Sequence, residues 1–163
     1  MCTIDVTSAC PGWNEGCPAA ESFARRAAEL ALARGAWASG LVWQGPVELS
    51  IVLADAGRQQ QLNRRYRGKD RSTNVLAFPA WDPAERAPST APILLGDVVL
   101  ALEVVAAEAS EQGKSIADHL GHLVVHGVLH LLGYDHDTQS RAQVMEALEK
   151  SILRELGVPD PYP

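Results

Sequence analysis

The sequence has few cysteines and no long apolar run, and each of these features disfavours a class of protein. Its 163 residues include three cysteines, all within the first 17 positions. An odd number without regular spacing does not make a disulfide framework or a paired C-x-x-C zinc site, so we expect reduced thiols. No run of about 18 uncharged apolar residues is present, which disfavours a membrane span. The N-terminus lacks a basic region followed by an apolar one, so we expect a cytoplasmic protein without a secretory signal.

The composition is that of an ordinary globular protein. Hydrophobic residues make up 47% of the chain and charged residues 21%, which disfavours a disordered or fibrous chain. The length suits one domain with one hydrophobic core. We expect that domain to cover residues 18–163, with residues 1–17 as an N-terminal extension that need not be ordered.

Positive charge is scarce overall and concentrated in one place. The net charge is −6, which taken alone disfavours a polyanionic partner because nucleic-acid affinity depends largely on phosphate neutralisation by Lys and Arg. Five of the 14 basic residues nevertheless fall in "RRYRGKDR", which we call the basic segment (residues 64–71): Arg64, Arg65, Arg67, Lys69 and Arg71. The distribution of charge therefore leaves an RNA partner open.

Hydrophobic periodicity and turn residues predict a mixture of helices and strands. The expected elements are a helix over 18–36, a strand over 47–55, a helix from 56 that ends at Gly68, strands over 74–80 and 93–102, and helices over 101–113, 115–132 and from about Asp137 to Gly157. The long loop over 81–92 is a candidate lid or binding loop, although a solvated connection is the commoner outcome. We expect a single-domain α+β fold whose mixed sheet packs against helices, with the histidine-bearing helix at the centre.

All five histidines lie between His119 and His136, and three of them have the spacing of metal ligands. His126 and His130 are four residues apart, which lets two imidazoles on one helix reach the same ion. Gly133 can adopt the positive φ of a sharp turn that brings His136 back to the same point. Three neutral nitrogen donors suit one Zn²⁺ ion and leave a fourth position open for chemistry. The alternative is three partly buried histidines satisfied by hydrogen bonds.

The remaining polar residues of this region carry weaker signals. His119 lies two turns before His126, so we expect an exposed or capping side chain. His122 could support the site or contact substrate, or it could simply fill the core. Asp135 could orient a ligand imidazole or cap the turn. Tyr134 could have no role other than packing.

Gly127 stands where zinc proteases of the H-E-x-x-H kind carry the glutamate that accepts a proton from water. Peptide hydrolysis by that route is therefore disfavoured. Zinc lowers the pKa of a bound water to about 7 even without a dedicated carboxylate. Phosphodiester cleavage also requires positive charge near the phosphoryl oxygens, and the basic segment could supply it.

Three motifs together are specific: "HGVLHLLGYDH", "RGKDRSTNVLAF" and "LLGDVVL". In this order they closely resemble the YbeY family of bacterial endoribonucleases, over about two thirds of the chain. The resemblance implies a zincin-like fold, one zinc ion at His126, His130 and His136, and cleavage of single-stranded RNA in small-subunit rRNA maturation and ribosome quality control. It places the family's important arginine on Arg67. The family commonly has serine at the position of Ala77, so any hydroxyl role there is absent.

The two lines of reasoning give one expected mechanism. Zinc acts on water or on the scissile phosphate while Arg67 stabilises developing negative charge, and either water or the RNA 2′-hydroxyl attacks. The expected substrate-binding residues are Arg64, Lys69, Thr73, Asn74 and His122. The expected partners are single-stranded RNA, ribosomal RNA and the small ribosomal subunit, with no membrane. Two alternatives remain: a metal-dependent hydrolase of another substrate, and a non-catalytic ribosome-assembly factor with structural zinc.

Overall fold

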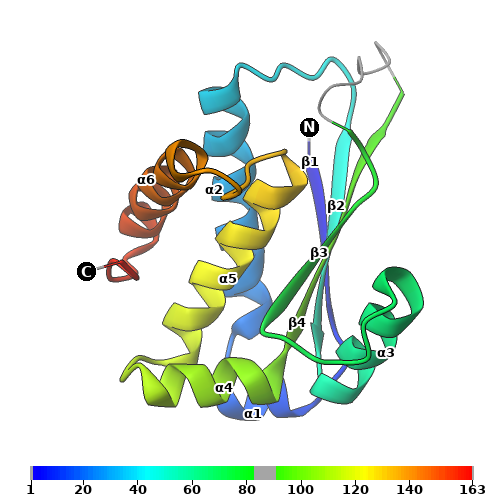
Figure 1. The fold of residues 1–163 in the computed structure, drawn as a ribbon, viewed down its shortest axis with the longest axis vertical. Coiled ribbons are helices and arrows are strands. Elements are labelled where there is room, and N and C mark those ends of the chain that lie inside the picture. Colours follow the sequence, from blue (N-terminus) through cyan, green and yellow to red (C-terminus); the bar gives the residue numbers. More distant parts are fainter. Residues whose placement is uncertain (1, 83–90, 163) are drawn as a thin grey trace.

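A computed structural model of the chain describes residues 2–82 and 91–162 (Figure 1). It shows a mixed four-stranded sheet with helices α2, α5 and α6 on one side and α3 on the other. In chain order the elements are β1 (Cys2–Ser8), α1 (Gly12–Gly16), α2 (Ala20–Ser39), β2 (Val47–Ala54), α3 (Ala56–Arg67), β3 (Val75–Pro79), β4 (Ile93–Ala101), α4 (Leu102–Glu111), α5 (Ile116–Leu131) and α6 (Gln139–Leu156). The expected single-domain α+β fold with a mixed sheet is confirmed.

The strand order is β1-β2-β4-β3. Strands β1, β2 and β4 run parallel, and β3 pairs antiparallel with β4. Along β2 the burial alternates, because Val47, Leu49 and Ile51 face the helices while the residues between them are more exposed. This topology leaves β3 as an edge strand of the sheet.

Helix α5 is the most buried helix and packs directly on the sheet. Ten of its residues are buried, most of them apolar, as expected for a helix enclosed on several sides. At Gly127 the approach is closest: a Cβ atom there would lie 2.7 Å from Cγ1 of Val98 on β4. The glycine in the histidine motif is therefore favoured by packing, because a side chain at this position would require the Val98 side chain to shift.

The ends of α3 follow the sequence signals closely, whereas α2 covers Ala20–Ser39 instead of 18–36. The Asp55 side chain accepts a hydrogen bond from the Arg58 amide and begins α3, and Gly68 ends it with a φ of 68°. Both features are as predicted. The start of α6 was predicted wrongly: its N-cap is Thr138, whose hydroxyl accepts from the Arg141 amide, rather than Asp137.

The first 17 residues are not the extension that the sequence suggested. Residues 2–8 form β1, which pairs in register with β2 along its whole length. Trp13 is completely buried, and its indole nitrogen donates to the Ala54 carbonyl at 2.9 Å. The signal in the sequence was short, because only Ile4 and Val6 alternate with polar residues on this strand. Residues 2–17 are thus part of the domain.

Three other expectations concern the surface and the cysteines. All three cysteines are free thiols. No helix in residues 2–82 and 91–162 is both long and apolar enough to cross a membrane. The predicted lid or binding loop over 81–92 lies mostly outside the described residues.

Candidate metal centre

Three imidazoles converge on one point, as their spacing predicted. The ligand atoms of His126, His130 and His136 all lie within 4.8 Å of one another. The Nε2 atoms of His126 and His130 are 3.0 Å apart. The ring of His136 lies 5.3 Å from that of His130 and 5.8 Å from that of His126, centroid to centroid. Only one ion fits among them.

The local backbone explains this convergence. One turn of α5 separates His126 from His130, so both rings leave the same face of the helix. Gly133 then has a φ of 97°, in the left-handed region that favours glycine, and reverses the chain towards His136. The Tyr134 hydroxyl donates to the Gly35 carbonyl of α2 at 2.8 Å and holds this turn against the core.

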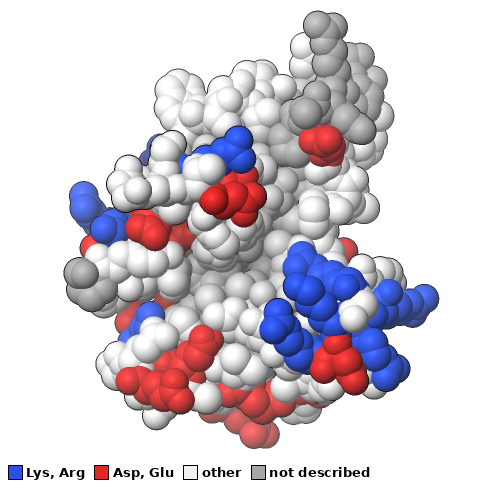
Figure 2. All heavy atoms as spheres, viewed as in Figure 1, with Lys and Arg blue, Asp and Glu red and all other residues white. Residues whose placement is uncertain are grey.

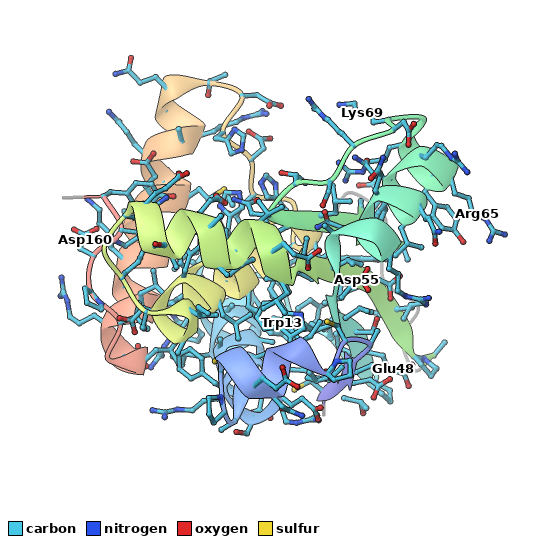
Figure 3. All side chains as sticks on the ribbon, turned by 90° about the horizontal axis from the view of Figure 1, so that it is seen from below. Trp13, Glu48, Asp55, Arg65, Lys69 and Asp160 are labelled. Carbon is cyan, nitrogen blue, oxygen red and sulfur yellow. The ribbon has the colours of Figure 1, made fainter. Side chains whose placement is uncertain are left out.

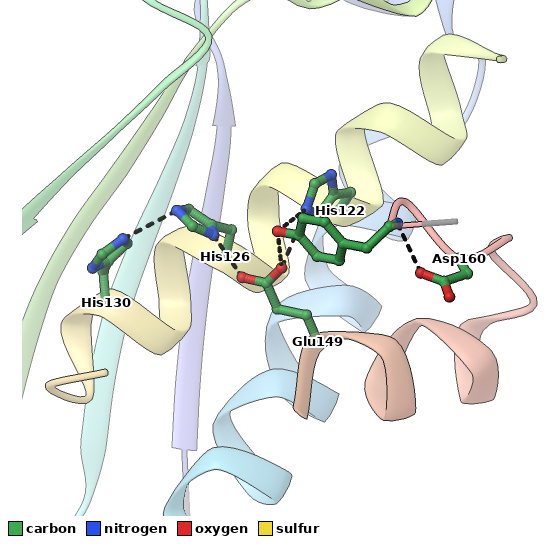
Figure 4. A network of polar contacts seen from close by, with 6 residues as sticks. His122, His126, His130, Glu149 and Asp160 are labelled. Atoms are coloured by element: carbon green, nitrogen blue, oxygen red, sulfur yellow. Dashed lines mark hydrogen bonds and ion pairs between the residues drawn. The ribbon is translucent and has the colours of Figure 1, made fainter. Parts of the chain in front are cut away.

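A buried carboxylate from a distant part of the chain supports the histidines (Figure 4). Glu149 of α6 is completely buried, and its Oε1 lies 2.5 Å from Nδ1 of His126. Its Oε2 accepts a hydrogen bond from the Tyr162 hydroxyl at 2.7 Å and lies 3.3 Å from Nε2 of His122. A carboxylate at Nδ1 keeps the proton on that nitrogen and leaves the lone pair of Nε2 for a metal.

The charge states of Glu149 and His130 follow from burial and from their neighbours. Burial by itself would raise the pKa of Glu149, but hydrogen bonds from His122 and His126 lower it to about 2. Burial, together with the nearby His126 and His136, lowers the pKa of His130 to about 4. Burial and the adjacent Glu149 raise the pKa of the Tyr162 hydroxyl. Neutral imidazole is the form that binds metal, so this donor set fits one divalent ion such as Zn²⁺.

The three histidines open into a cavity of about 560 Å³. It lies between α5 and the edge strand β3, and its lining also includes Arg67, Asn74, His122 and Tyr162. Figure 2 shows the basic residues gathered at one rim of the hollow in the centre of this face. The histidine cluster is therefore accessible from solvent beside the positive region of the surface.

Arg67 reaches this cavity from the last turn of α3. Its Nη2 donates to the Ala77 carbonyl on β3, and its guanidinium carbon lies 5.2 Å above the centroid of the Phe78 ring. These two contacts fix the guanidinium at the edge of the sheet. Within residues 2–82 and 91–162 it makes no ion pair, which leaves its charge available to an anion in the cavity.

The expected substrate-binding residues divide into two groups. Asn74 and His122 line the cavity, and the Asn74 amide is held by Glu108 at 2.8 Å. The Thr73 amide instead donates to the Gln59 side chain at 2.8 Å, and Thr73 does not line the cavity. Arg64 and Lys69 are exposed and line no cavity with the histidines. Figure 3 shows Lys69 projecting outward at the same edge of the molecule as Arg65.

In the histidine region the expectation for His119 is wrong, and the structure decides between the two alternatives for Asp135. His119 is buried, with 3% of its surface exposed, rather than exposed or capping, and its Nε2 lies 3.6 Å from Glu108 Oε1. That side of α5 faces α4, which covers it. Asp135 contacts no imidazole: its carboxylate accepts from the Asp137 amide and from Arg141, so it caps the turn.

Sequence reasoning missed Glu149 and Tyr162. Glu149 stands in an ordinary amphipathic helix, 23 residues after His126, and no local spacing distinguishes it from the other acidic residues of α6. A glutamate at a helix position otherwise occupied by buried apolar residues was the available signal, since Met145, Ile152, Leu153 and Leu156 mark that face.

Comparisons with known proteins agree on one family. The family described as Endoribonuclease YbeY matches residues 19–157. A protein named Endoribonuclease YbeY from Paramagnetospirillum magneticum is 54% identical over 161 residues, covering 98% of this chain and 94% of that one. Another of that name, from Rhodospirillum rubrum, is 47% identical over 152 residues, covering 92% and 76%. The solution structure of TM1509 from Thermotoga maritima has a TM-score of 0.57, with 21% identity and 99% of both chains covered, and supports the fold alone.

Proposed function

Since this chain belongs to the YbeY endoribonuclease family, we propose that it is a zinc-dependent endoribonuclease specific for single-stranded RNA. Its proposed role is small-subunit rRNA maturation and ribosome quality control in the cytoplasm, with ribosomal RNA and the small ribosomal subunit as partners. A zincin-like arrangement, in which α5 is the metal-binding helix, is part of the proposal. One observation carries it: three imidazoles converge in an open cavity that Arg67 also lines.

The proposed metal ligands are His126, His130 and His136. A zinc ion held there supplies a Lewis acid for oxygens at the scissile phosphate. Glu149 keeps the Nδ1 proton of His126 in place and so fixes the ring orientation. The histidines and Glu149 are positioned before substrate binds, since the Glu149 carboxylate is buried and already accepts a hydrogen bond from Tyr162.

Arg67 is the proposed catalytic residue of the chain itself. Its guanidinium has five N–H donors, and the hydrogen bond to Ala77 uses one nitrogen and leaves others for phosphate oxygens. Its position over the Phe78 ring and its bond to Ala77 hold the guanidinium in place, so little reorganisation is needed when charge develops on the phosphate. Asn74 and His122 are proposed to contact substrate within the cavity, and Arg64, Lys69 and Thr73 are proposed to contact it outside.

The packing at Gly127 supports RNA over peptide as substrate. Gly127 stands at the position of the protease glutamate and has no side chain to act as a general base, and the Val98 side chain lies against it. Arginine at the opposite rim instead suits a phosphodiester, whose charge rises in the transition state.

The zinc-loaded protein should be assayed on single-stranded RNA, the same RNA in a duplex, and casein, each with and without chelator. We expect cleavage of the single strand alone, abolished by the chelator and restored by zinc. Casein hydrolysis would favour a different hydrolase. A non-catalytic assembly factor would be favoured if none of the three substrates were cleaved and if variants of the three histidines still supported ribosome maturation.

A further inference from the structure

Two exposed arginines and two aromatic rings form a continuous row of side-chain contacts that extends from the edge of the histidine cavity to the outer face of the sheet. Arg65 lies 5.4 Å from the centroid of the Tyr66 ring, the Tyr66 and Phe78 rings are 5.9 Å apart at 64°, and Arg67 lies 5.2 Å from the Phe78 ring. We call these four residues the Arg-aromatic stack. It alternates cation and ring, an arrangement suited to both phosphates and bases.

Tyr66 is the exposed member of the stack. Its surface is 62% exposed, and its hydroxyl makes no hydrogen bond to any residue that the structure describes. Its ring contacts Phe78 through an edge, and most of the side chain remains open to solvent. Beneath it a cavity of about 340 Å³ opens between α3 and the sheet, lined by Leu62, Phe78 and Val99 among others.

The stack is connected to the metal centre through the edge strand. On β3, Ala77 and Pro79 line the histidine cavity, whereas Phe78 between them lines the outer cavity. Arg67 extends around this edge, since it contributes to the histidine cavity, bonds Ala77 and covers Phe78. A strand passing over the edge of β3 thus contacts both cavities.

The surrounding charge favours a polyanion. None of Arg64, Arg65, Arg67, Lys69 and Arg71 forms an ion pair within residues 2–82 and 91–162. Figure 3 shows Lys69 on the same side of the molecule as Arg65, a member of the stack. A double helix keeps its bases paired and stacked on one another, so only an unpaired base can lie on Tyr66. The basic segment supplies the phosphate contacts, and the aromatic ring supplies a contact that charge alone does not provide.

We propose that the Arg-aromatic stack is a binding subsite for single-stranded RNA, in which an unpaired base stacks on Tyr66 while the chain continues over β3 to the metal centre. This inference rests on the proposed function and deepens it, because it assigns the path of the RNA outside the cleavage site. It also gives the single-strand preference a structural origin remote from the metal.

The test compares the affinity of wild type, Tyr66→Ala, Tyr66→Phe and Tyr66→Trp for a 2′-O-methyl single-stranded RNA, by fluorescence anisotropy. Loss of one stacked base should weaken binding about tenfold in Tyr66→Ala, while Phe and Trp stay within about twofold. The slope of affinity against salt should not change, since no phosphate contact is removed. Trp37→Ala is the matched control, because Trp37 is 85% exposed on α2 and lines neither cavity.

A strand of the same length without bases separates stacking from charge. Wild type and Tyr66→Ala should bind it equally, and thermal unfolding should show that both are folded. Equal affinity of these two proteins for the complete RNA, or an equal loss in Tyr66→Phe, would overturn the stacking subsite. Cleavage of unmodified RNA by the wild type is measured in parallel. If the wild type cleaves RNA and the Tyr66 variants bind it normally, only the stacking subsite is wrong. If the wild type neither cleaves nor binds RNA, the proposed function is wrong as well.

Discussion

Oε1 of Glu149 lies 2.5 Å from Nδ1 of His126, within a site where the carboxylate has no solvent exposure at all. A buried carboxylate without partners is costly, so it is retained only where hydrogen bonds satisfy it. Here His126, His122 and Tyr162 do so. The contact couples α6 and the chain end to the metal centre on α5.

Glu149→Gln should weaken zinc binding by about tenfold or more, because the amide carries no charge to hold the Nδ1 proton of His126. The measurement is a competition titration of zinc against a chromophoric chelator. Glu155→Gln is the control on the same helix, since that residue pairs with Arg34 at the surface. Zinc affinities that agree for Glu149→Gln and wild type would remove Glu149 from the metal site.

The metal-free protein should lose stability on acidification. The pKa of His130 is lowered from 6.5 to about 4 in the fold, so the unfolded chain takes up that proton first and stability falls as pH drops from 6.5 towards 4. The pKa of Glu149 is lowered from 4.5 to about 2, and its contribution is lost over that lower range. Urea unfolding at several pH values measures this. The free energy of unfolding should fall less between pH 6.5 and 4 in His130→Gln than in wild type, and an equal fall in both proteins would contradict the lowered pKa of His130.

The convergence of the three histidines was predictable because they are close in sequence. His126 and His130 share a helix face and Gly133 predicts a turn, so eleven consecutive residues contain all three proposed ligands. The caps of α3 were predictable for the same reason. Glu149 was not, because its role depends on how α6 packs on α5. His119 was placed wrongly for a similar reason: helix periodicity gives its direction, but the burial comes from α4.

Strand β1 shows the same limit in the sheet. A strand at the edge carries a weak hydrophobic signal, since Ile4 and Val6 are its only buried residues. What identifies it as a strand is its pairing with β2, a contact across about 45 residues of chain. Gly127 could be read from the sequence only as a missing glutamate. Its close contact with Val98 depends on how α5 packs on the sheet, which the sequence does not show.

Substituting Arg64, Lys69 and Arg71 together by alanine should weaken RNA binding and flatten its dependence on salt. For each phosphate contact that is lost, RNA binding releases about one counterion fewer. Anisotropy titrations at several salt concentrations measure both quantities. The control is Arg25, Arg26 and Arg154, three arginines outside the basic segment, substituted in the same way. If the triple variant of the basic segment keeps the wild-type salt slope, the segment is not part of the RNA interface.

Arg67→Lys and Arg67→Ala should both lower the cleavage rate at saturating RNA by about 10²-fold, with zinc content little changed. Lysine cannot present two parallel donors, nor can it stack on Phe78 while bonding Ala77 as the guanidinium does. Single-turnover rates at increasing RNA concentration separate catalysis from binding. Recovery of the wild-type rate at saturation would reduce Arg67 to a binding residue.

The most direct test of the account is zinc content measured with RNA cleavage in the same preparations of wild type, His126→Ala, His130→Ala and His136→Ala. We expect about one equivalent of zinc in the wild type, less than one in each variant, and cleavage that falls with the zinc. Asp135→Asn, whose carboxylate contacts no imidazole, should match the wild type. Full zinc retention in all three histidine variants, or undiminished cleavage by the metal-free wild type, would contradict a three-histidine catalytic metal centre.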